Sequence, residues 1–396
     1  RTRAGLEPSF IDNISLYRHS KGRSPTLIWM NLHCDEEVYQ TRHTPKKGTK
    51  AFETDLAHLA LLWSKNDDIV LVREKPQNST LQTLQALDLP LPEFVLWDGE
   101  SLPPLTHPRI ATVEPWGWTP TATRIAKALG SKLISESCPI KWDPEWANLY
   151  AKTNANNSLK EWHNSQGKTL SIPTDSIGTI VTHSQQIPDA SQDRPLLIKA
   201  PFSTSGRHRI IHTGKPFGPR VEKWIEQMLQ RQGALVVEPY LEKLADFSIH
   251  LKDEGPPQIS RFFTDANGKY RGTLVSRWDN GLPSTWKQFL HTGDGNPRWL
   301  KRVAQSLSDW IKSNNDAFPG PISIDSLLYR TPSGDLAFKP IVEINPRQTM
   351  SRLALRFRHK IAPRRPTPAT PSAHRCCADA RCRRTRKAST CCTPRN

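Results

Sequence analysis

The sequence predicts an α/β domain over residues 1–142, an α+β domain with antiparallel sheets over residues 143–358, and a basic tail over residues 359–396. In the first segment, short apolar runs alternate with runs of helical spacing, which is typical of an open α/β sheet. In the second segment, successive apolar runs are joined by turn residues, which favours antiparallel sheets packed against helices. Neither periodicity continues into the tail.

The composition indicates a folded protein with more than one hydrophobic core. The 396 residues exceed what one core usually serves, and 36% hydrophobic residues with 13 Trp supply enough apolar side chains. No apolar run approaches the roughly eighteen residues of a membrane-spanning helix, so we expect a soluble protein without a membrane partner. Only Cys34 and Cys138 precede the tail, which suits the reducing cytoplasm and provides no disulfide framework.

The positive charge is concentrated at the carboxyl-terminal end. Thirteen of the 55 Lys and Arg residues and one of the 38 acidic residues follow Met350, so this end carries +12 of the formal +17 and leaves +5 to the first 350 residues. A nucleic-acid partner is therefore expected for the tail at most. The tail also mixes Pro, Arg, Ala and five of the seven Cys residues without a period, so it cannot build a core.

Three interpretations of the tail stay open. His374, Cys376, Cys377 and Cys382 could bind zinc, although adjacent cysteines lack the usual C-x2-C spacing. The basic residues could form an arm that binds nucleic acid. The abrupt change of composition after Arg358 favours the third interpretation, a disordered tail produced by a shift of reading frame.

The first domain is expected to alternate strands with helices. The strands are residues 26–32, 69–74 and 93–97, and the helices are residues 52–65, 79–89 and 119–134, the last after the loop Trp116-Gly117-Trp118. No G-x-G-x-x-G motif follows these strands, so a dinucleotide-binding fold is not supported. His33, Cys34, Asp35 and Glu36 could bind a metal, but residues in this position more often end a strand.

The second domain is expected to open with a helix after residue 143 and then to form strands. Residues 194–214 read as a strand, a loop of small residues and a second strand, and residues 219–232 carry one apolar helical face. Asn267-Gly268 is a strong hairpin signal between two later strands. The remaining expected elements are strands at 234–240, 246–253, 259–265 and 269–277, and a helix with apolar residues at 300, 303, 307, 310 and 311.

The segment Ser323 to Met350, "SIDSLLYRTPSGDLAFKPIVEINPRQTM", reads as a last hairpin with an unusual polar content. If its turn centres near Gly334, antiparallel pairing places Asp325 opposite Glu343, and Asn345 lies on the same face as Glu343. Carboxylates packed together repel each other, and a hard cation such as Mg2+ relieves that repulsion because it prefers oxygen ligands. The sequence therefore predicts a metal site on this hairpin.

Lys199 ends the apolar run "LLIK" and precedes the loop "APFSTSGRHR". Hydroxyl groups and backbone N–H groups of such a loop could surround phosphate oxygens, while Lys199 neutralises their charge. The alternative is that Lys199 only extends from an edge strand into solvent. The loop by itself favours that alternative, whereas its combination with the acidic hairpin favours a phosphate site.

These motifs together resemble the ATP-grasp superfamily. "LLIKAPFSTSGR", "ALVVEPYLEKLADFS" and "SIDSLLYR…IVEINPR" follow one another in the order of that superfamily, and they most resemble uncharacterised bacterial ATP-grasp proteins with a Ser-Thr-Ser-Gly-Arg loop. The resemblance covers about Asp143 to Phe357. It implies an ATP-grasp fold for the second domain and a pre-ATP-grasp-like role for the first.

The resemblance also implies roles for individual residues. Lys199 would bind the α- and β-phosphates, and Lys152, with Lys160 or Lys168 as substitutes, would be the lysine near the start of the grasp domain. Arg347 would lie near the reacting phosphate and carboxylate, so Arg347 and Lys199 would be catalytic. The other implied positions are Ser203, Thr204, Ser205, Gly206 and Arg207 as the phosphate-covering loop, Glu238, Pro239, Tyr240 and Leu241 as the adenine hinge, Asp246 for the ribose, and Asp325, Glu343 and Asn345 as ligands of Mg2+ or Mn2+.

The activity implied by the resemblance is that of an ADP-forming carboxylate–amine ligase. ATP would convert a small carboxylate to an acyl phosphate, which an amine or another nucleophile then attacks. The alternative is an ATP-binding protein without turnover, because the loop has only Gly206 where a more flexible cover is expected. The Trp116-Gly117-Trp118 loop could contact an apolar part of the acid if it faces the cleft, although core packing is the commoner role of Trp. No motif indicates an oligomeric state.

Overall fold

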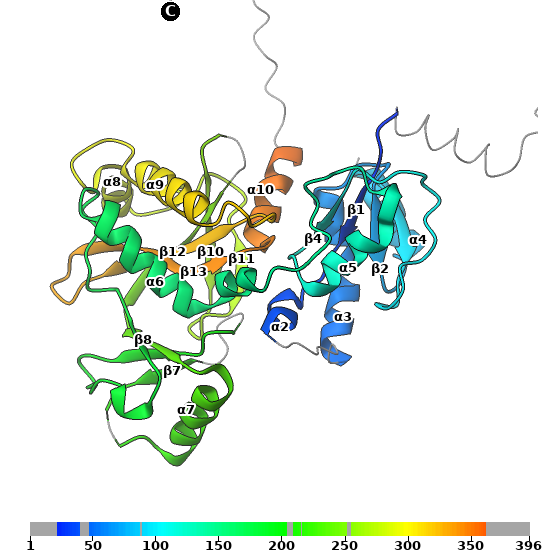
Figure 1. Ribbon diagram of the computed structural model, residues 1–396. Coiled ribbons are helices and arrows are strands. Elements are labelled where there is room, and N and C mark those ends of the chain that lie inside the picture. Colours follow the sequence, from blue (N-terminus) through cyan, green and yellow to red (C-terminus); the bar gives the residue numbers. More distant parts are fainter. Residues whose placement is uncertain are drawn as a thin grey trace, which may run out of the picture. The chain divides into compact units, whose positions relative to one another are not determined.

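The computed structural model describes residues 22–39, 47–87, 89–203, 209–214, 216–251 and 255–361. Within these residues, one parallel sheet and two antiparallel sheets organise the chain (Figure 1). No helix among them is long and apolar enough to cross a membrane. The zinc interpretation of His374, Cys376, Cys377 and Cys382 concerns the tail, which lies outside the described residues.

The first sheet is parallel, as the alternation of strands and helices predicts. Its order is β3-β2-β1-β4, so the chain adds β2 and β3 on one side of β1 and then β4 on the other. Strands β1 and β2 are buried along their whole length, which explains their continuous apolar sequence. The bounds are Thr26–Trp29 (β1), Ile69–Val72 (β2), Glu93–Leu96 (β3) and Thr112–Pro115 (β4).

The helices of this part differ in length from the sequence prediction. The segment predicted as one helix over residues 52–65 forms α3 (Lys47–Leu56) and a 3-10 helix (Ala57–Leu62). Helix α5 (Pro120–Leu129) starts at Thr119, whose side chain accepts a hydrogen bond from the Ala122 N–H, and ends before Gly130, which has φ +52°. The other helices are α2 (Cys34–Tyr39) and α4 (Asn78–Ala86).

The second sheet has four antiparallel strands in the order β5-β8-β6-β7. Helix α7 (Pro219–Gln232) packs its apolar face on this sheet, with Ile225 and Met228 in the same core cluster as Ile198. The strands are Thr179–Val181 (β5), Leu196–Lys199 (β6), Arg209–His212 (β7) and Leu235–Pro239 (β8).

The third sheet has five antiparallel strands in the order β11-β10-β9-β12-β13. The predicted turns are confirmed, because Gly268 with φ +70° joins β10 to β11 and Gly334 with φ +92° joins β12 to β13. The strands are Glu242–His250 (β9), Gln258–Thr264 (β10), Tyr270–Thr273 (β11), Ser323–Arg330 (β12) and Leu336–Asn345 (β13), and the helices are α6 (Lys152–Trp162), α8 (Ser284–Thr292), α9 (Trp299–Asn314) and α10 (Met350–Ile361).

The two faces of the five-stranded sheet differ in chemistry. Ile249, Ile324 and Ile344 are register partners on one face and belong to the core cluster that contains Trp162 of α6 and Trp299 of α9. The next residues along the strands face the opposite way. They are Ser248, Asp325 and Glu343, which are also register partners. The helices therefore cover the apolar face, and the polar groups gather on the other face.

Candidate active site

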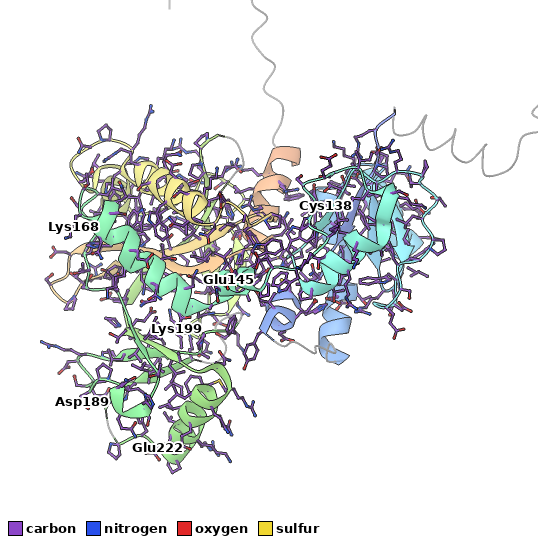
Figure 2. All side chains as sticks on the ribbon, in the orientation of Figure 1. Cys138, Glu145, Lys168, Asp189, Lys199 and Glu222 are labelled. Carbon is purple, nitrogen blue, oxygen red and sulfur yellow. The ribbon has the colours of Figure 1, made fainter. Side chains whose placement is uncertain are left out.

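Two lysines from different sheets share one buried carboxylate. Lys199, the last residue of β6 and labelled in Figure 2, forms an ion pair with Glu238 of β8. Lys339 of β13 donates to the other oxygen of Glu238 at 2.7 Å. The three side chains are each at most 9% exposed. Glu238 therefore links the four-stranded sheet to the five-stranded sheet beside the predicted phosphate-binding lysine.

This triad has an excess of positive charge. Burial raises the pKa of the Glu238 carboxyl, but the charges of Lys199 and Lys339 outweigh that effect and lower its pKa to about 2. Burial also lowers the pKa of Lys339, which Glu238 opposes. Asp175, which accepts a hydrogen bond from the Tyr329 hydroxyl at 2.5 Å, adds a weaker compensating charge. Two ammonium groups around one carboxylate favour an anion nearby, such as a phosphate.

The acidic hairpin is built as the sequence predicts. Asp325 pairs with Glu343 across the ladder, and Asn345 Nδ2 donates to Asp325 Oδ2 at 3.0 Å. Burial and the charge of Glu343 raise the pKa of Asp325 to about 7. Two crowded carboxylates with one amide oxygen match the ligands that Mg2+ prefers, so the residues fit a magnesium ion.

Lys152 connects the acidic hairpin to the loop after β6. As the first residue of α6, it donates from Nζ to Glu343 Oε1 at 3.0 Å and to the Ser203 carbonyl at 2.5 Å. Its backbone N–H donates to the Pro201 carbonyl at 2.9 Å. The alternative lysines, Lys160 and Lys168, are both exposed. The position of Lys152 thus favours it over these substitutes.

The predicted phosphate-covering loop is described only at its start. Ser203 accepts the hydrogen bond from Lys152, and Thr204, Ser205, Gly206 and Arg207 lie outside the described residues. Just before the loop, Gln232 holds the Phe202 backbone, accepting from its N–H at 2.8 Å and donating to its carbonyl at 3.3 Å. The role predicted for the loop stays a prediction.

The predicted hinge places a side chain as well as backbone groups at the site. The Glu238 side chain belongs to the lysine triad, and the Tyr240 N–H donates to the Pro195 carbonyl at 2.9 Å. Within the described residues the Leu241 N–H has no hydrogen-bond acceptor. Asp246 on β9 accepts from Lys243 at 2.7 Å and from Thr264 at 2.9 Å. It lies on the polar face, two residues before Ser248.

Arg347 contacts the α/β part of the chain. Its Nε donates to both oxygens of Asp35, at 2.9 and 3.0 Å, and this charge raises the pKa of Arg347 against the effect of burial. The adjacent Gln348 N–H donates to the Trp116 carbonyl at 2.7 Å. The Tyr150 hydroxyl donates to the Trp118 and Pro346 carbonyls at 3.0 and 3.2 Å. The end of β13 is thus joined to the segment that follows β4.

Sequence reasoning missed two of these contacts. Lys339 lies in the apolar strand "LAFKPIVEIN", where a lysine signals a buried partner. The sequence pattern groups Asp35 with His33, Cys34 and Glu36, as a metal cluster or a strand end, and gives no sign of its contact with Arg347. Within the described parts of the chain, no group of three or more His, Cys, Asp and Glu residues could hold a metal ion.

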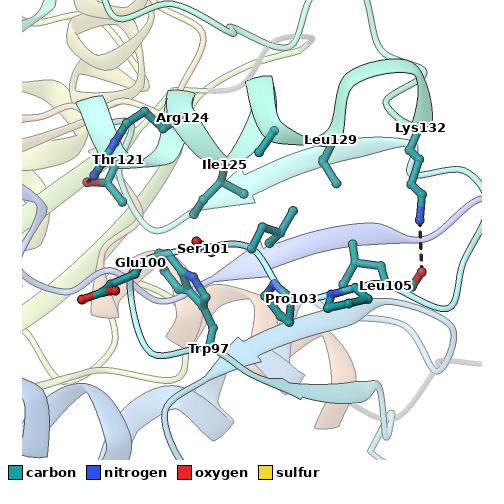
Figure 3. Close-up of a pocket in the computed structure, with 13 residues that line it drawn as sticks. Trp97, Glu100, Ser101, Pro103, Leu105, Thr121, Arg124, Ile125, Leu129 and Lys132 are labelled. Carbon is teal, nitrogen blue, oxygen red and sulfur yellow. Dashed lines mark hydrogen bonds between the residues drawn. The ribbon is translucent and has the colours of Figure 1, made fainter.

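The tryptophan loop reaches Arg347 through its backbone, but its tryptophan side chains are buried, and a groove elsewhere in the first domain is lined by other residues. Trp116 and Trp118 are buried in core clusters, as the commoner role of tryptophan suggests. A groove of about 530 Å3 lies between helix α5 and residues 97–105, with Arg124 and Glu100 at one end and Lys132 at the other (Figure 3). None of the predicted site residues lines it. Its size would favour a binding site there, but the convergent lysines and carboxylates favour the polar face of the five-stranded sheet.

No family model and no curated protein matches the sequence. Among solved structures, the chain is similar to an N5-carboxyaminoimidazole synthetase from Staphylococcus aureus complexed with ADP (12% identity, covering 83% of this chain and 71% of that chain, TM-score 0.42). It is also similar to an L-amino acid ligase from Bacillus licheniformis (13% identity, covering 84% of this chain and 69% of that chain, TM-score 0.41). A third similar structure is a D-alanine-D-alanine ligase from Helicobacter pylori (12% identity, covering 84% of this chain and 93% of that chain, TM-score 0.40). TM-scores below 0.5 leave the function to be argued from the site residues.

Proposed function

We propose that this chain is an ATP- and Mg2+-dependent ligase of the ATP-grasp type. It activates a small carboxylate as an acyl phosphate, and an amine or another nucleophile then displaces the phosphate. The observation that carries the proposal is the pair of hydrogen bonds from Lys152, which bring the acidic hairpin to the loop that follows Lys199. Lysines, paired carboxylates and the first residue of a hydroxyl-rich sequence in one place suit phosphoryl transfer.

The proposed roles follow from the charges at each position. Lys199 and Lys152 bind phosphate oxygens as point charges, and residues 203–207 cover the phosphates. Asp325, Glu343 and Asn345 hold Mg2+, which neutralises phosphate charge when bound. Arg347 binds the transferring phosphoryl group and the acceptor carboxylate. The Pro239 carbonyl and the Leu241 N–H hold the adenine, and Asp246 holds the ribose.

The proposed domain boundaries remain those of the sequence. Residues 143–358 form the ATP-grasp domain, and residues 1–142 form the pre-ATP-grasp-like domain that supplies part of the acceptor site. This arrangement is supported by the contact of Arg347 with Asp35, because that contact joins the two segments at the reacting end of the hairpin. The buried state of Trp116 and Trp118 removes the argument for an aromatic acceptor, so the proposal keeps only a small carboxylate.

Nucleotide binding tests the proposal directly. Isothermal titration calorimetry with a non-hydrolysable ATP analogue and Mg2+ should show at least about tenfold weaker binding for Lys199→Ala, because a hydrogen bond to a charged group contributes about 1.5–3 kcal/mol. Lys160→Ala, which removes an exposed lysine of α6, is the matched control and should bind like the parent. Equal affinities for Lys199→Ala and the parent would refute the assignment of Lys199.

A nucleotide-binding protein without turnover is the second candidate. It is favoured by the single glycine in residues 203–208, since loop closure over the phosphates is easier with more glycine. Release of ADP during incubation with pooled amino acids and small carboxylic acids distinguishes the two candidates. ATP binding without any ADP release would favour the second.

A further inference from the structure

The guanidinium of Arg347 is held from one side by Asp35. The Arg347 Nε donates to Oδ1 at 2.9 Å and to Oδ2 at 3.0 Å. The Nη1 donates to the Gln348 carbonyl at 3.3 Å, and the Nη2 has no acceptor among the described residues. The side chain keeps 16% of its surface exposed. One face of the guanidinium is thus fixed by protein, and Nη2 is left for another acceptor.

The backbone around this ion pair is tightly packed. The Asn31 side chain bonds both sides of Gly117, donating to its carbonyl at 2.8 Å and accepting from its N–H at 3.1 Å. A Cβ on Gly117 would lie 2.7 Å from the Cys34 sulfur and 3.2 Å from the Arg347 Cβ. Only glycine allows the segments that carry Asp35 and Arg347 to approach this closely.

The same guanidinium acts electrostatically on the acidic hairpin. Arg347 follows Asn345, the last residue of β13, by two positions and Glu343 by four. Arg347 therefore lies within electrostatic reach of the carboxylates proposed to hold Mg2+.

We propose that Asp35 is a positioning residue, which holds Arg347 by Nε so that Nη2 stays available to the γ-phosphate of ATP and to the acceptor carboxylate. This inference rests on the proposed function. Asp35 belongs to the first turn of α2, directly after β1, so the α/β segment contributes to the geometry of the reacting centre without touching the nucleotide. The competing explanation is an ion pair that only stabilises the contact between the two segments.

The test compares two nucleotides that differ by the γ-phosphate. Calorimetry on the full chain with Mg2+ gives the affinity for adenylyl imidodiphosphate divided by that for ADP. Asp35→Ala should lower this ratio about tenfold, because Arg347 loses its orientation at one hydrogen bond to a charged group. Asp35→Asn keeps one oxygen for Nε and should lower the ratio less. Asp67→Asn, which breaks an ion pair with Arg23 in the same segment, should leave it unchanged.

A double-mutant cycle separates positioning from mere stabilisation. If Asp35 acts through Arg347, the ratio for Asp35→Ala combined with Arg347→Ala equals that for Arg347→Ala alone within about twofold. Additive losses, or equal weakening of both nucleotides by Asp35→Ala, overturn the inference. A rise in the ratio in Asp35→Ala also overturns it, because Asp35 would then compete with the phosphate for Arg347.

The outcomes also separate this inference from the proposed function. If the parent chain binds neither nucleotide, both are overturned. If the parent binds both nucleotides and Arg347→Ala lowers the ratio while Asp35→Ala does not, only the positioning role is overturned. Thermal melts of every variant identify any that fails to fold, and Asp35→Asn, which keeps the shape of the side chain, then carries the test.

Discussion

Replacing Glu238 by Gln is expected to loosen the four-stranded sheet. The parent holds Lys199 and Lys339 against one carboxylate, and the Lys339 side chain is only 2% exposed. Removing one partner of a buried ion pair typically costs about 3–5 kcal/mol, because the remaining charge stays buried without compensation. We expect about 3 kcal/mol here, since the Gln oxygen still accepts a hydrogen bond from one lysine.

Hydrogen–deuterium exchange measures this loss locally. A change of about 3 kcal/mol in the free energy of opening corresponds to roughly hundredfold faster exchange. The acceleration should appear in peptides that cover β6 and β8, and peptides from β1 and β2 of the parallel sheet serve as the internal control. Glu238→Gln combined with Lys339→Met removes one uncompensated ammonium group and should recover part of the loss. Exchange in β6 and β8 that stays within twofold of the parent would refute the reasoning.

Two further predictions concern the metal ligands of the acidic hairpin and the loss of stability when Glu238 is protonated. Glu343→Gln and Asn345→Ala should each weaken the Mg2+ dependence of nucleotide binding while circular dichroism stays that of the parent, and identical Mg2+ titrations would count against the metal site. The pKa of Glu238 is about 2 in the folded chain against an ordinary value of 4.5, so the stability that it contributes is fully present above about pH 4.5 and is lost as the pH falls toward 2. The free energy of unfolding of the parent should therefore fall more steeply over this range than that of Glu238→Gln, and parallel curves would contradict this.

The sequence predicted those structural features that depend only on residues close together in the chain. The turn at Gly334 sets the register of its hairpin, so the pairing of Asp325 with Glu343 followed from strand geometry alone. Strand β4 escaped prediction because Thr112–Pro115 is short, polar at two positions and ends in Pro. Its position becomes clear only from its pairing with β1.

Long-range ion pairs could not be predicted in this way. Lys339 lies 101 residues from Glu238, and Arg347 lies 312 residues from Asp35. Nothing local distinguishes Glu238 as a lysine partner from Glu238 as a hinge residue, because the hinge uses only backbone groups and leaves the side chain to pair with residues far away in the sequence. The packing of the four-stranded sheet against the five-stranded sheet decides which lysine reaches Glu238. That packing is a property of the whole fold.

The charges along β13 predict that nucleotide and metal binding depend on each other. Lys339 belongs to the positive triad, and Glu343, four residues later, belongs to the acidic pair. A phosphate chain alone is attracted by the lysines but repelled by Asp325 and Glu343. Mg2+ alone is attracted by these two carboxylates but repelled by the lysines. A complex of both neutralises the two groups together. By linkage, Mg2+ should raise the affinity for ATP by the same factor as ATP raises the affinity for Mg2+. Calorimetry that finds ATP binding unaffected by Mg2+ would show that the acidic hairpin does not share a site with the lysines.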